Sequence, residues 1–272
     1  MQQSLPSLDF QAGSATALLE RMEVQELRRH LALFLDIDGT LLDLAPTPSA
    51  VVVPDDLASV LQALETALDG ALALVTGRGL ADVDRLFARG RFIIGAQHGA
   101  ELRGPVQPAP DSPAAFSVLE RLRPRLEALV PDWPGLLLED KGRSVALHYR
   151  QNQSLAVGLK ALVSRILARE SDEIELLEGK CVLEIKPRAF DKGGVVRALM
   201  AVPPFERRVP LFIGDDETDR TGMAAARALG GCAIRVGGKR DLEADGYLPS
   251  PAAARAWLKD LAGRLDERRS GP

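Results

Sequence analysis

The sequence is poor in cysteine and in aromatic residues. Only two cysteines, Cys181 and Cys232, occur among 272 residues, and aromatic residues make up 4% of the chain. Two cysteines so far apart, with no Cys-x-x-Cys spacing, argue against a disulfide framework and against a zinc site. We therefore predict that both are small core residues in a reducing cytosol.

Long apolar runs and an excess of basic charge are also missing. No apolar run approaches the roughly 18 residues of a membrane-spanning helix, and the first thirty residues lack the apolar stretch of a secretion signal. The formal charge of −4 provides no basic field that would attract nucleic acid. We expect a cytoplasmic protein, a monomer, that binds neither membrane nor nucleic acid. Any affinity for a phosphorylated ligand must therefore come from the residues of its binding site and not from the net charge of the protein.

What the sequence does contain is an apolar stretch that ends in two acids. Five apolar residues, Leu31 to Leu35, run without interruption, as in a central parallel strand covered on both faces by helices. Asp36 and Asp38 follow directly, and Gly39 permits a sharp turn. In open α/β sheets, ligands bind beyond the carboxyl ends of the strands. A strand followed by an Asx-type turn would account for the same residues without any function.

Strands and helices alternate through the first and last thirds of the chain. Further strands are predicted over 71–75, 92–94, 211–213 and 233–236, and helices over 15–29, 55–68, 80–89, from 191, over 219–229 and from 251. This alternation is typical of a parallel sheet wound by right-handed crossovers. We predict an α/β fold in which residues 31–107 and 188–272 form a doubly wound, mostly parallel sheet. Residues 1–30 would be an N-terminal extension.

The middle third breaks this alternation. Proline and glycine are frequent between Gly104 and Pro113, which indicates a linker. Helices are then predicted over 114–130 and 154–169, and strands over 135–140, 143–150, 173–178 and 181–187. The strand pairs separated by Lys141-Gly142 and Gly179-Lys180 are typical of antiparallel hairpins. We predict an α+β cap domain over residues 108–187, inserted into the wound domain.

Polar residues follow three predicted strands and begin one helix. Beyond Asp36 and Asp38, Thr76 ends the second strand, Lys192 begins a helix, and the fourth strand leads into Asp215, Asp216 and Asp219. Several carboxylates in one crevice raise one another's pKa values unless a cation is present. Mg²⁺ prefers carboxylate oxygens together with substrate phosphate. The pattern therefore predicts a magnesium site that binds a phosphoryl group.

These residues could also carry out phosphoryl transfer. An ionised Asp36 can attack phosphorus and form an acyl phosphate. Asp38 can donate a proton to the leaving oxygen and later accept one from water. Thr76 and Lys192 can bind phosphate oxygens.

Four segments, in this order, resemble the four motifs of the haloacid dehalogenase superfamily: Asp36-Ile37-Asp38-Gly39-Thr40, Thr76-Gly77-Arg78, Lys192-Gly193 and Gly214-Asp215-Asp216-Glu217-Thr218-Asp219. The resemblance implies a Rossmannoid core with Asp36 as nucleophile, Asp38 as acid and base, and Thr76 and Lys192 on the phosphate. It implies Mg²⁺ bound by Asp36, the Asp38 main-chain carbonyl and Asp215. Asp216 and Asp219 would be supporting or water-mediated ligands.

Residues 94–101, 139–150 and 179–188 resemble bacterial trehalose-6-phosphate phosphatases. The resemblance implies hydrolysis of trehalose 6-phosphate in trehalose biosynthesis, with a cap that grips the sugar. Independently, strand alternation places Val145 and Leu147 on one face and His148 and Arg150 on the other. A solvated face with cross-strand ion pairs would show the same alternation. The candidate substrate-binding residues are Gly77, Arg78, His98, Lys141, His148, Arg150, Glu184, Lys186 and Arg188.

Two other functions fit part of the pattern. A phosphatase of the same superfamily that acts on sucrose phosphate or a mannosylglycerate phosphate would share the core chemistry and differ in the cap. A receiver-like signalling module also gathers acids, a Thr or Ser and a Lys around Mg²⁺. Asp38 and an insertion of roughly 80 residues, close to the size of a whole domain, argue against the receiver.

Overall fold

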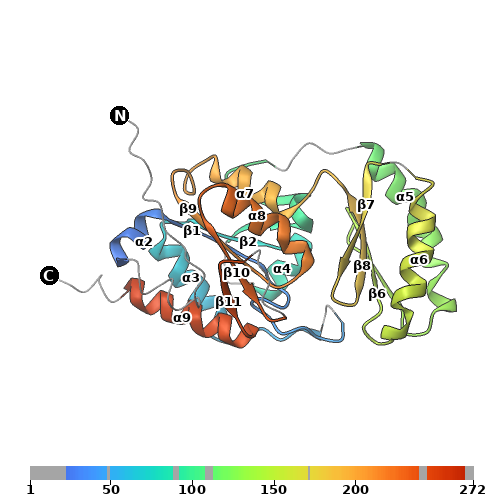
Figure 1. The fold of residues 1–272 in the computed structure, drawn as a ribbon, viewed down its shortest axis with the longest axis horizontal. Coiled ribbons are helices and arrows are strands. Elements are labelled where there is room, and N and C mark those ends of the chain that lie inside the picture. Colours follow the sequence, from blue (N-terminus) through green and yellow to red (C-terminus); the bar gives the residue numbers. More distant parts are fainter. Residues whose placement is uncertain are drawn as a thin grey trace.

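The computed structural model describes residues 23–47, 50–87, 92–107, 113–170, 172–238 and 244–266. Two sheets, each with its own helices, follow one another along the long axis of the molecule (Figure 1). The first and last thirds of the chain build the larger sheet, and the middle third builds the smaller one. The molecule is thus an α/β fold with an inserted α+β unit, as the sequence predicts.

The larger sheet has seven strands in the order β11-β10-β9-β1-β2-β3-β4. These strands are β1 (Leu31–Leu35), β2 (Leu72–Val75), β3 (Ile93–Ala96), β4 (Glu101–Arg103), β9 (Val209–Gly214), β10 (Cys232–Val236) and β11 (Gly246–Leu248). Neighbouring strands pair in parallel except β3 and β4, which are antiparallel. Strand β1 lies between β2 and β9, and all five of its residues are buried. This position explains its uninterrupted apolar sequence.

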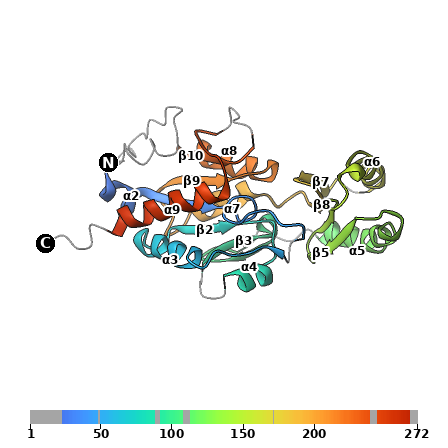
Figure 2. The ribbon, with the colours of Figure 1, turned by 90° about the horizontal axis from the view of Figure 1, so that it is seen from below.

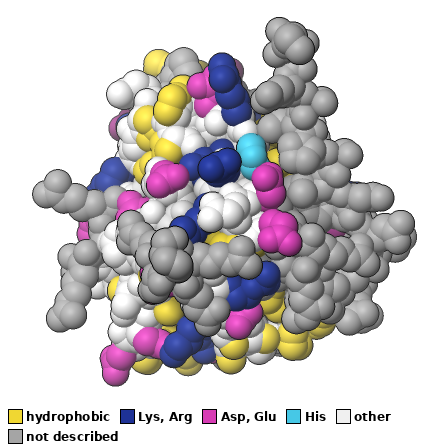
Figure 3. Space-filling view, turned by 90° about the vertical axis from the view of Figure 1, so that its left-hand side faces the viewer, with side chains coloured by type: hydrophobic (Ala, Val, Ile, Leu, Met, Phe, Trp, Pro, Cys, Tyr) yellow, Lys and Arg dark blue, Asp and Glu magenta, His cyan; other side chains and the backbone are white. Residues whose placement is uncertain are grey.

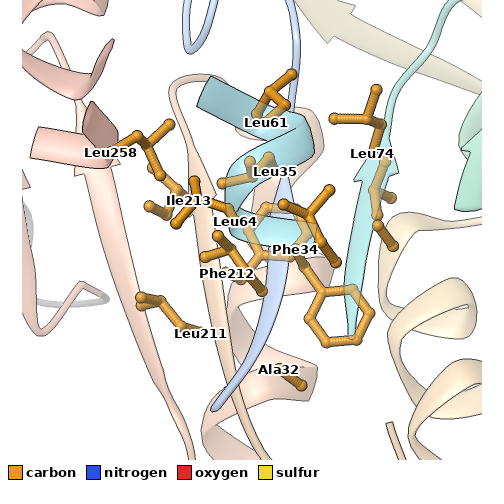
Figure 4. Close-up of a cluster of buried hydrophobic side chains, with 14 of the residues drawn as sticks. Ala32, Phe34, Leu35, Leu61, Leu64, Leu74, Leu211, Phe212, Ile213 and Leu258 are labelled. Atoms are coloured by element: carbon orange, nitrogen blue, oxygen red, sulfur yellow. The ribbon is translucent and has the colours of Figure 1, made fainter. Parts of the chain in front are cut away.

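Helices cover both faces of the larger sheet. Helix α3 (Leu57–Ala67) packs against α9 (Pro251–Asp266) on one face, and α7 (Lys192–Met200) packs against α8 (Arg220–Ala228) on the other (Figures 1 and 2). Two shorter helices are α2 (Val24–His30), which contacts α9, and α4 (Leu80–Leu86), which lies between β2 and β3 in sequence. Figure 4 shows Leu61 and Leu64 of α3 and Leu258 of α9 among the side chains of β1, β2 and β9. Packing in this core fixes the positions of the strand ends relative to one another.

The smaller sheet has four strands in the order β5-β6-β8-β7, and all neighbours are antiparallel. Its strands are β5 (Leu137–Asp140), β6 (Val145–His148), β7 (Ile174–Gly179) and β8 (Val182–Pro187). Helices α5 (Pro113–Glu127) and α6 (Ala156–Leu167) cover one face, and the other face is turned toward the larger sheet (Figure 2). Val145, Leu147, Leu183 and Ile185 are buried in a separate cluster under these helices. The predicted placing of Val145 and Leu147 on one face of β6 is therefore confirmed.

The structure differs from the sequence-based expectations at several places. The edge strands β4 and β11 were not expected, because each has only three residues and no apolar run. Of the expected helix over 15–29, the part before residue 23 lies outside the described residues. Cys232 is buried as predicted, but the prediction is wrong for Cys181, which is partly exposed at the turn between β7 and β8. Its backbone φ of +64° suits a tight turn, not a core strand.

Within the described ranges, no helix is both long and apolar enough to span a membrane. Figure 3 shows the end of the molecule opposite the smaller sheet, where acidic and basic side chains are interspersed with hydrophobic and other atoms.

Candidate active site

A cavity lies between the carboxyl ends of the central strands and the open face of the smaller sheet. Its polar lining from the larger unit comprises Asp36, Asp38, Thr47, Thr76, Gly77, Arg78, His98, Lys192, Asp215, Asp216 and Thr218. The smaller sheet and its turns contribute Glu139, Lys141, His148, Arg150, Lys180 and Glu184. Most of the site residues that the sequence predicts therefore line this one cavity.

The centre of the cavity is a buried cluster of acids around one lysine. Lys192, the first residue of α7, donates hydrogen bonds to Asp36 Oδ1 and Asp219 Oδ1, both at 2.6 Å. Carboxylate oxygens of Asp36, Asp215 and Asp219 lie within 4.8 Å of one another, and all three residues are buried. The strand ends of β1 and β9 supply Asp36 and Asp215, and the 3-10 turn η5 (Glu217–Asp219) supplies Asp219. The Lys192 ammonium group therefore contacts two of the three buried carboxyl groups.

The pKa values of this cluster reflect the shortage of positive charge. Burial, followed by the charge of Asp219, raises the pKa of Asp215 to about 6. Burial and Asp219 also raise the pKa of Asp36 well above its usual value, although Lys192 opposes the shift. Burial would lower the pKa of Lys192, but the charges of Asp219 and Asp36 outweigh it, so the net shift is upward.

The cluster fits a divalent cation. Asp215 Oδ1 is buried without a hydrogen-bond partner, which is costly for a carboxylate oxygen. A hard cation such as Mg²⁺ binds oxygen ligands of this type and would supply the missing positive charge.

Glycine allows these acids to approach one another. Gly39 has φ of +79°, and a Cβ there would lie 2.1 Å from Asp215 Oδ2. The backbone N–H groups of Asp215 and Asp216 donate to Asp219 Oδ2 at 2.9 and 3.0 Å. The loop after β9 is therefore folded around the Asp219 carboxylate.

Asp38 points away from the acid cluster and toward the end of β2. Arg78 binds it in a bidentate manner. Its Nε donates to Asp38 Oδ2 and its Nη2 donates to Asp38 Oδ1, both at 2.6 Å. Arg78 is buried, whereas the Asp38 side chain is 32% exposed to the cavity. Thr76 is also buried, and its Oγ1 accepts a hydrogen bond from the Arg78 backbone N–H at 3.1 Å. Arg78 thus orients the Asp38 carboxyl group.

A hydrogen-bonded group at Glu184 joins the two units. Glu184 Oε2 lies 3.2 Å from His98 Nε2 and accepts from Lys141 Nζ at 3.1 Å. Lys141 Nζ also donates to the Gly77 carbonyl at 3.1 Å, and Ser144 Oγ donates to Glu184 Oε1 at 2.6 Å. Burial lowers the pKa of His98 despite the neighbouring Glu184. Burial alone would raise the pKa of Glu184, but Lys141 and His98 hold it well below its usual range.

A second pair lies nearer the cavity mouth. His148 Nε2 is 2.8 Å from Glu139 Oε2, and Arg150 Nη2 donates to the Lys180 carbonyl at 2.7 Å. Burial would raise the pKa of Glu139, yet the hydrogen bond from His148 and the charge of Lys141 lower it overall. The open face of the smaller sheet therefore carries donors and acceptors of both charges.

The structure does not bring every nominated residue to the cavity. Lys186 is buried and pairs at 2.6 Å with Glu175, which lies opposite it on β7. Arg188 is exposed and donates to the Asp172 carbonyl and to Glu175. Cross-strand pairing thus takes both residues, and neither lines the cavity. Asp216 lies outside the three-acid cluster, because its carboxylate accepts from the N–H groups of Glu217 and Lys180.

Two charged lining residues, Lys180 and Glu139, were not predicted from the sequence. Lys180 forms an ion pair with Asp215 from the turn between β7 and β8, and Glu139 faces the cavity from β5. The sequence predicted a hairpin turn at Gly179-Lys180, but it did not predict which residues this turn contacts. For Glu139, the spacing of two from Lys141 was the available signal.

Comparisons with known proteins show which family this sequence resembles. The family model described as trehalose-phosphatase matches residues 34–244. A Sinorhizobium fredii protein named "Probable trehalose-phosphate phosphatase" is 44% identical, over 85% of this chain and 87% of its own. The Escherichia coli trehalose-6-phosphate phosphatase is 37% identical, over 91% of this chain and 92% of its own.

The fold is also similar to a solved structure. The C-terminal domain of the C. albicans trehalose-6-phosphate phosphatase superposes with a TM-score of 0.76 at 21% identity, over 86% of this chain and 93% of that one. The fold of this chain, including its inserted α+β unit, is therefore similar to that of this solved phosphatase domain. Because the family model matches residues 34–244 and the two bacterial relatives are 44% and 37% identical over most of their lengths, the chain belongs to the trehalose-phosphatase family.

Proposed function

We propose that this chain hydrolyses trehalose 6-phosphate to trehalose and inorganic phosphate. The observation that carries the proposal is the buried group of Asp36, Lys192, Asp215 and Asp219 facing a polar sheet across one cavity. The names of the two sequence relatives support the choice of substrate.

Asp36 is the proposed nucleophile. Its carboxylate attacks phosphorus, and the bond between phosphorus and the sugar oxygen breaks as the aspartyl phosphate forms. Asp38, oriented by Arg78, donates a proton to the departing sugar oxygen. It then accepts a proton from the water that attacks the aspartyl phosphate, which releases phosphate and restores Asp36.

Lys192 and Thr76 hold phosphate oxygens in this scheme. Lys192 already contacts Asp36 Oδ1, so its ammonium group lies beside the position of the transferred phosphoryl group. Asp36, Asp215 and the main-chain carbonyl of Asp38 would hold Mg²⁺, with Asp216 and Asp219 in support, and the ion would offset phosphoryl charge.

Residues 108–187 are proposed to act as the cap that recognises the sugar. The cavity-facing side chains Lys141, His148, Arg150 and Glu184 offer donors and acceptors for hydroxyl groups, with Gly77, Arg78 and His98 opposite them. We assign no sugar contact to Lys186 or Arg188, whose partners lie elsewhere.

Two alternatives make different predictions. A phosphatase for sucrose phosphate or a mannosylglycerate phosphate would keep the core chemistry with another sugar. A receiver-like module would bind Mg²⁺ without turnover. The polar face of the inserted sheet, which closes one side of the cavity, favours an enzyme with a bound sugar over a receiver.

Phosphate release from a panel of trehalose, sucrose, glucose and mannosylglycerate phosphates, with Mg²⁺ and with EDTA, tests this proposal. We expect trehalose 6-phosphate to be hydrolysed fastest, only with metal, and Asp36→Asn to lower the rate on the order of 10⁴-fold or more, as loss of a nucleophile does elsewhere. The control is Asp84→Asn, which removes an exposed acid paired with Arg103. Faster hydrolysis of another sugar phosphate would contradict the substrate, and full activity of Asp36→Asn would contradict the mechanism.

The expectations of a monomer, of a cytoplasmic location and of no nucleic-acid partner remain predictions. Gel filtration with light scattering, cell fractionation and a nucleic-acid binding assay would test them.

A further inference from the structure

The turn between β7 and β8 reaches from the smaller sheet to the acidic loop of the larger one. Lys180 Nζ forms an ion pair with Asp215 Oδ2, and the Lys180 backbone N–H donates to Asp216 Oδ2 at 3.0 Å. A Cβ on Gly179 would lie 2.9 Å from the same Asp216 oxygen. The turn is therefore seated closely on the two acids that follow β9.

The two partners of the ion pair differ in freedom. The Lys180 side chain is 39% exposed, whereas that of Asp215 is 2% exposed. The second oxygen of Asp215, Oδ1, is buried without a hydrogen-bond partner and belongs to the residue trio Asp36, Asp215 and Asp219. A divalent cation bound by this trio would compete with Lys180 for the charge of Asp215.

The other cations that line the cavity have different partners. Lys192 donates to Asp36 and Asp219, Lys141 donates to Glu184 and the Gly77 carbonyl, and Arg78 binds Asp38. Among the described cations that line the cavity, Lys180 alone extends from the smaller sheet and contacts an acid of the Asp36, Asp215 and Asp219 cluster. The partner of Lys180 is Asp215, whose carboxylate a bound divalent cation would use as a ligand.

We propose that Lys180 is a further phosphate-binding residue, held by Asp215 in the metal-free protein and transferred to the phosphoryl oxygens when a divalent cation occupies the acid cluster. The inference rests on the proposed function, and it adds a cation from the cap to the phosphate site. Lys180 lines the same cavity as Thr76 and Lys192, so its ammonium group has a short route between the two positions. Metal and phosphate binding thereby become coupled through one side chain.

Calorimetric titration of the full chain tests the transfer. The probes are Mg²⁺ alone and inorganic phosphate at saturating Mg²⁺, and the variant is Lys180→Gln. We expect Mg²⁺ to bind a few-fold more tightly to Lys180→Gln, because the competing cation is gone. We expect phosphate to bind about tenfold more weakly, because a charged hydrogen bond is lost.

The matched control is Lys160→Gln, which removes a cap lysine that pairs with Glu178 on the surface. It should leave both affinities within twofold of wild type, and Lys180→Arg should recover most of the phosphate affinity. Unchanged thermal unfolding of Lys180→Gln would confirm that the variant folds. Phosphate or Mg²⁺ affinity of Lys180→Gln within twofold of wild type would overturn the transfer. Neither titration involves a sugar, so a wrong substrate assignment and a wrong role for Lys180 give separate results.

Discussion

At the scale of single residues, the two oxygens of Asp215 have different surroundings. Oδ2 contacts Lys180, whereas Oδ1 has no hydrogen-bond partner, and burial with the charge of Asp219 raises the pKa of the group to about 6. In the metal-free protein, Asp215 is therefore protonated below about pH 6 and ionised above it. A metal ion must displace that proton before the carboxylate can bind it.

We predict that Mg²⁺ affinity rises with pH through the range in which Asp215 and Asp36 lose their protons, because the pKa values of both carboxyl groups are raised. At pH 5, one unit below the pKa of Asp215, the affinity should be at least about tenfold weaker than at pH 7, with uptake of Mg²⁺ releasing protons from Asp215 and Asp36. Calorimetry in two buffers of different ionisation enthalpy measures both quantities. An affinity that is constant between pH 5 and pH 7 would contradict this account.

At the scale of elements, the turn after β1 brings two strand ends together. Gly39 follows β1 with φ of +79°, and there is no room for a Cβ beside Asp215. Gly230, after α8, has the same φ of +79° but has nothing within 4 Å of the position of a Cβ. The pair separates the cost of the backbone conformation from the cost of the close approach.

We predict unequal effects of alanine at these two glycines. Gly230→Ala should lower the free energy of unfolding by about 1–2 kcal/mol, the cost of a left-handed residue that carries a Cβ. Gly39→Ala should lower it by a further 1–3 kcal/mol, roughly the cost of overpacking a buried site, and should weaken Mg²⁺ binding. Urea unfolding and Mg²⁺ titration of both variants measure this. Equal losses in the two variants would argue against the close approach at Asp215.

At the scale of the whole molecule, His98 and Glu184 join the two sheets. Burial lowers the pKa of His98, so the unfolded chain takes up a proton more readily than the folded one. The stabilisation associated with this shift is fully present above the unfolded pKa, about 6.5, and is lost as the pH falls from there toward the folded value. The pKa of Glu184 is lowered too, which acts in the same direction at more acidic pH.

We predict that the free energy of unfolding depends less on pH in His98→Gln than in wild type between pH 6.5 and 5. The difference in slope should be at most about 1.4 kcal/mol per pH unit, the value for one proton. The raised pKa of Asp215 changes the free energy of unfolding with pH in the opposite direction. Asp215 is present in both proteins, so its contribution cancels in the difference. Parallel urea-unfolding profiles for the two proteins would refute a role for His98.

The larger sheet could be predicted from sequence because its strands are buried on both faces. Uninterrupted apolar runs such as Leu31–Leu35 predict the strands, and the acids that follow them lie at the strand ends. The structure brings Asp36, Lys192 and Asp215 together, as expected. The strands β4 and β11 could not be predicted, since they have three residues each and depend on their neighbours.

The cap residues were harder because alternation assigns a face and not a partner. Glu184 and Lys186 lie on the same face of β8, yet Glu184 reaches His98 while Lys186 is paired across the sheet with Glu175. Lys180 was missed because the contact of a turn tip with another unit is tertiary and leaves no periodicity in the sequence.

The strand order has a consequence for biosynthesis. Strand β1, which carries the nucleophile candidate Asp36, lies against β9, and the smaller unit stands between them in the chain. While the ribosome is still translating the middle third, β1 has β2 on one side and an unpaired edge on the other. An open edge of this kind is a template for pairing with other chains. The nascent polypeptide is thus without its acid cluster, and most exposed to aggregation, until residues 209–219 have emerged.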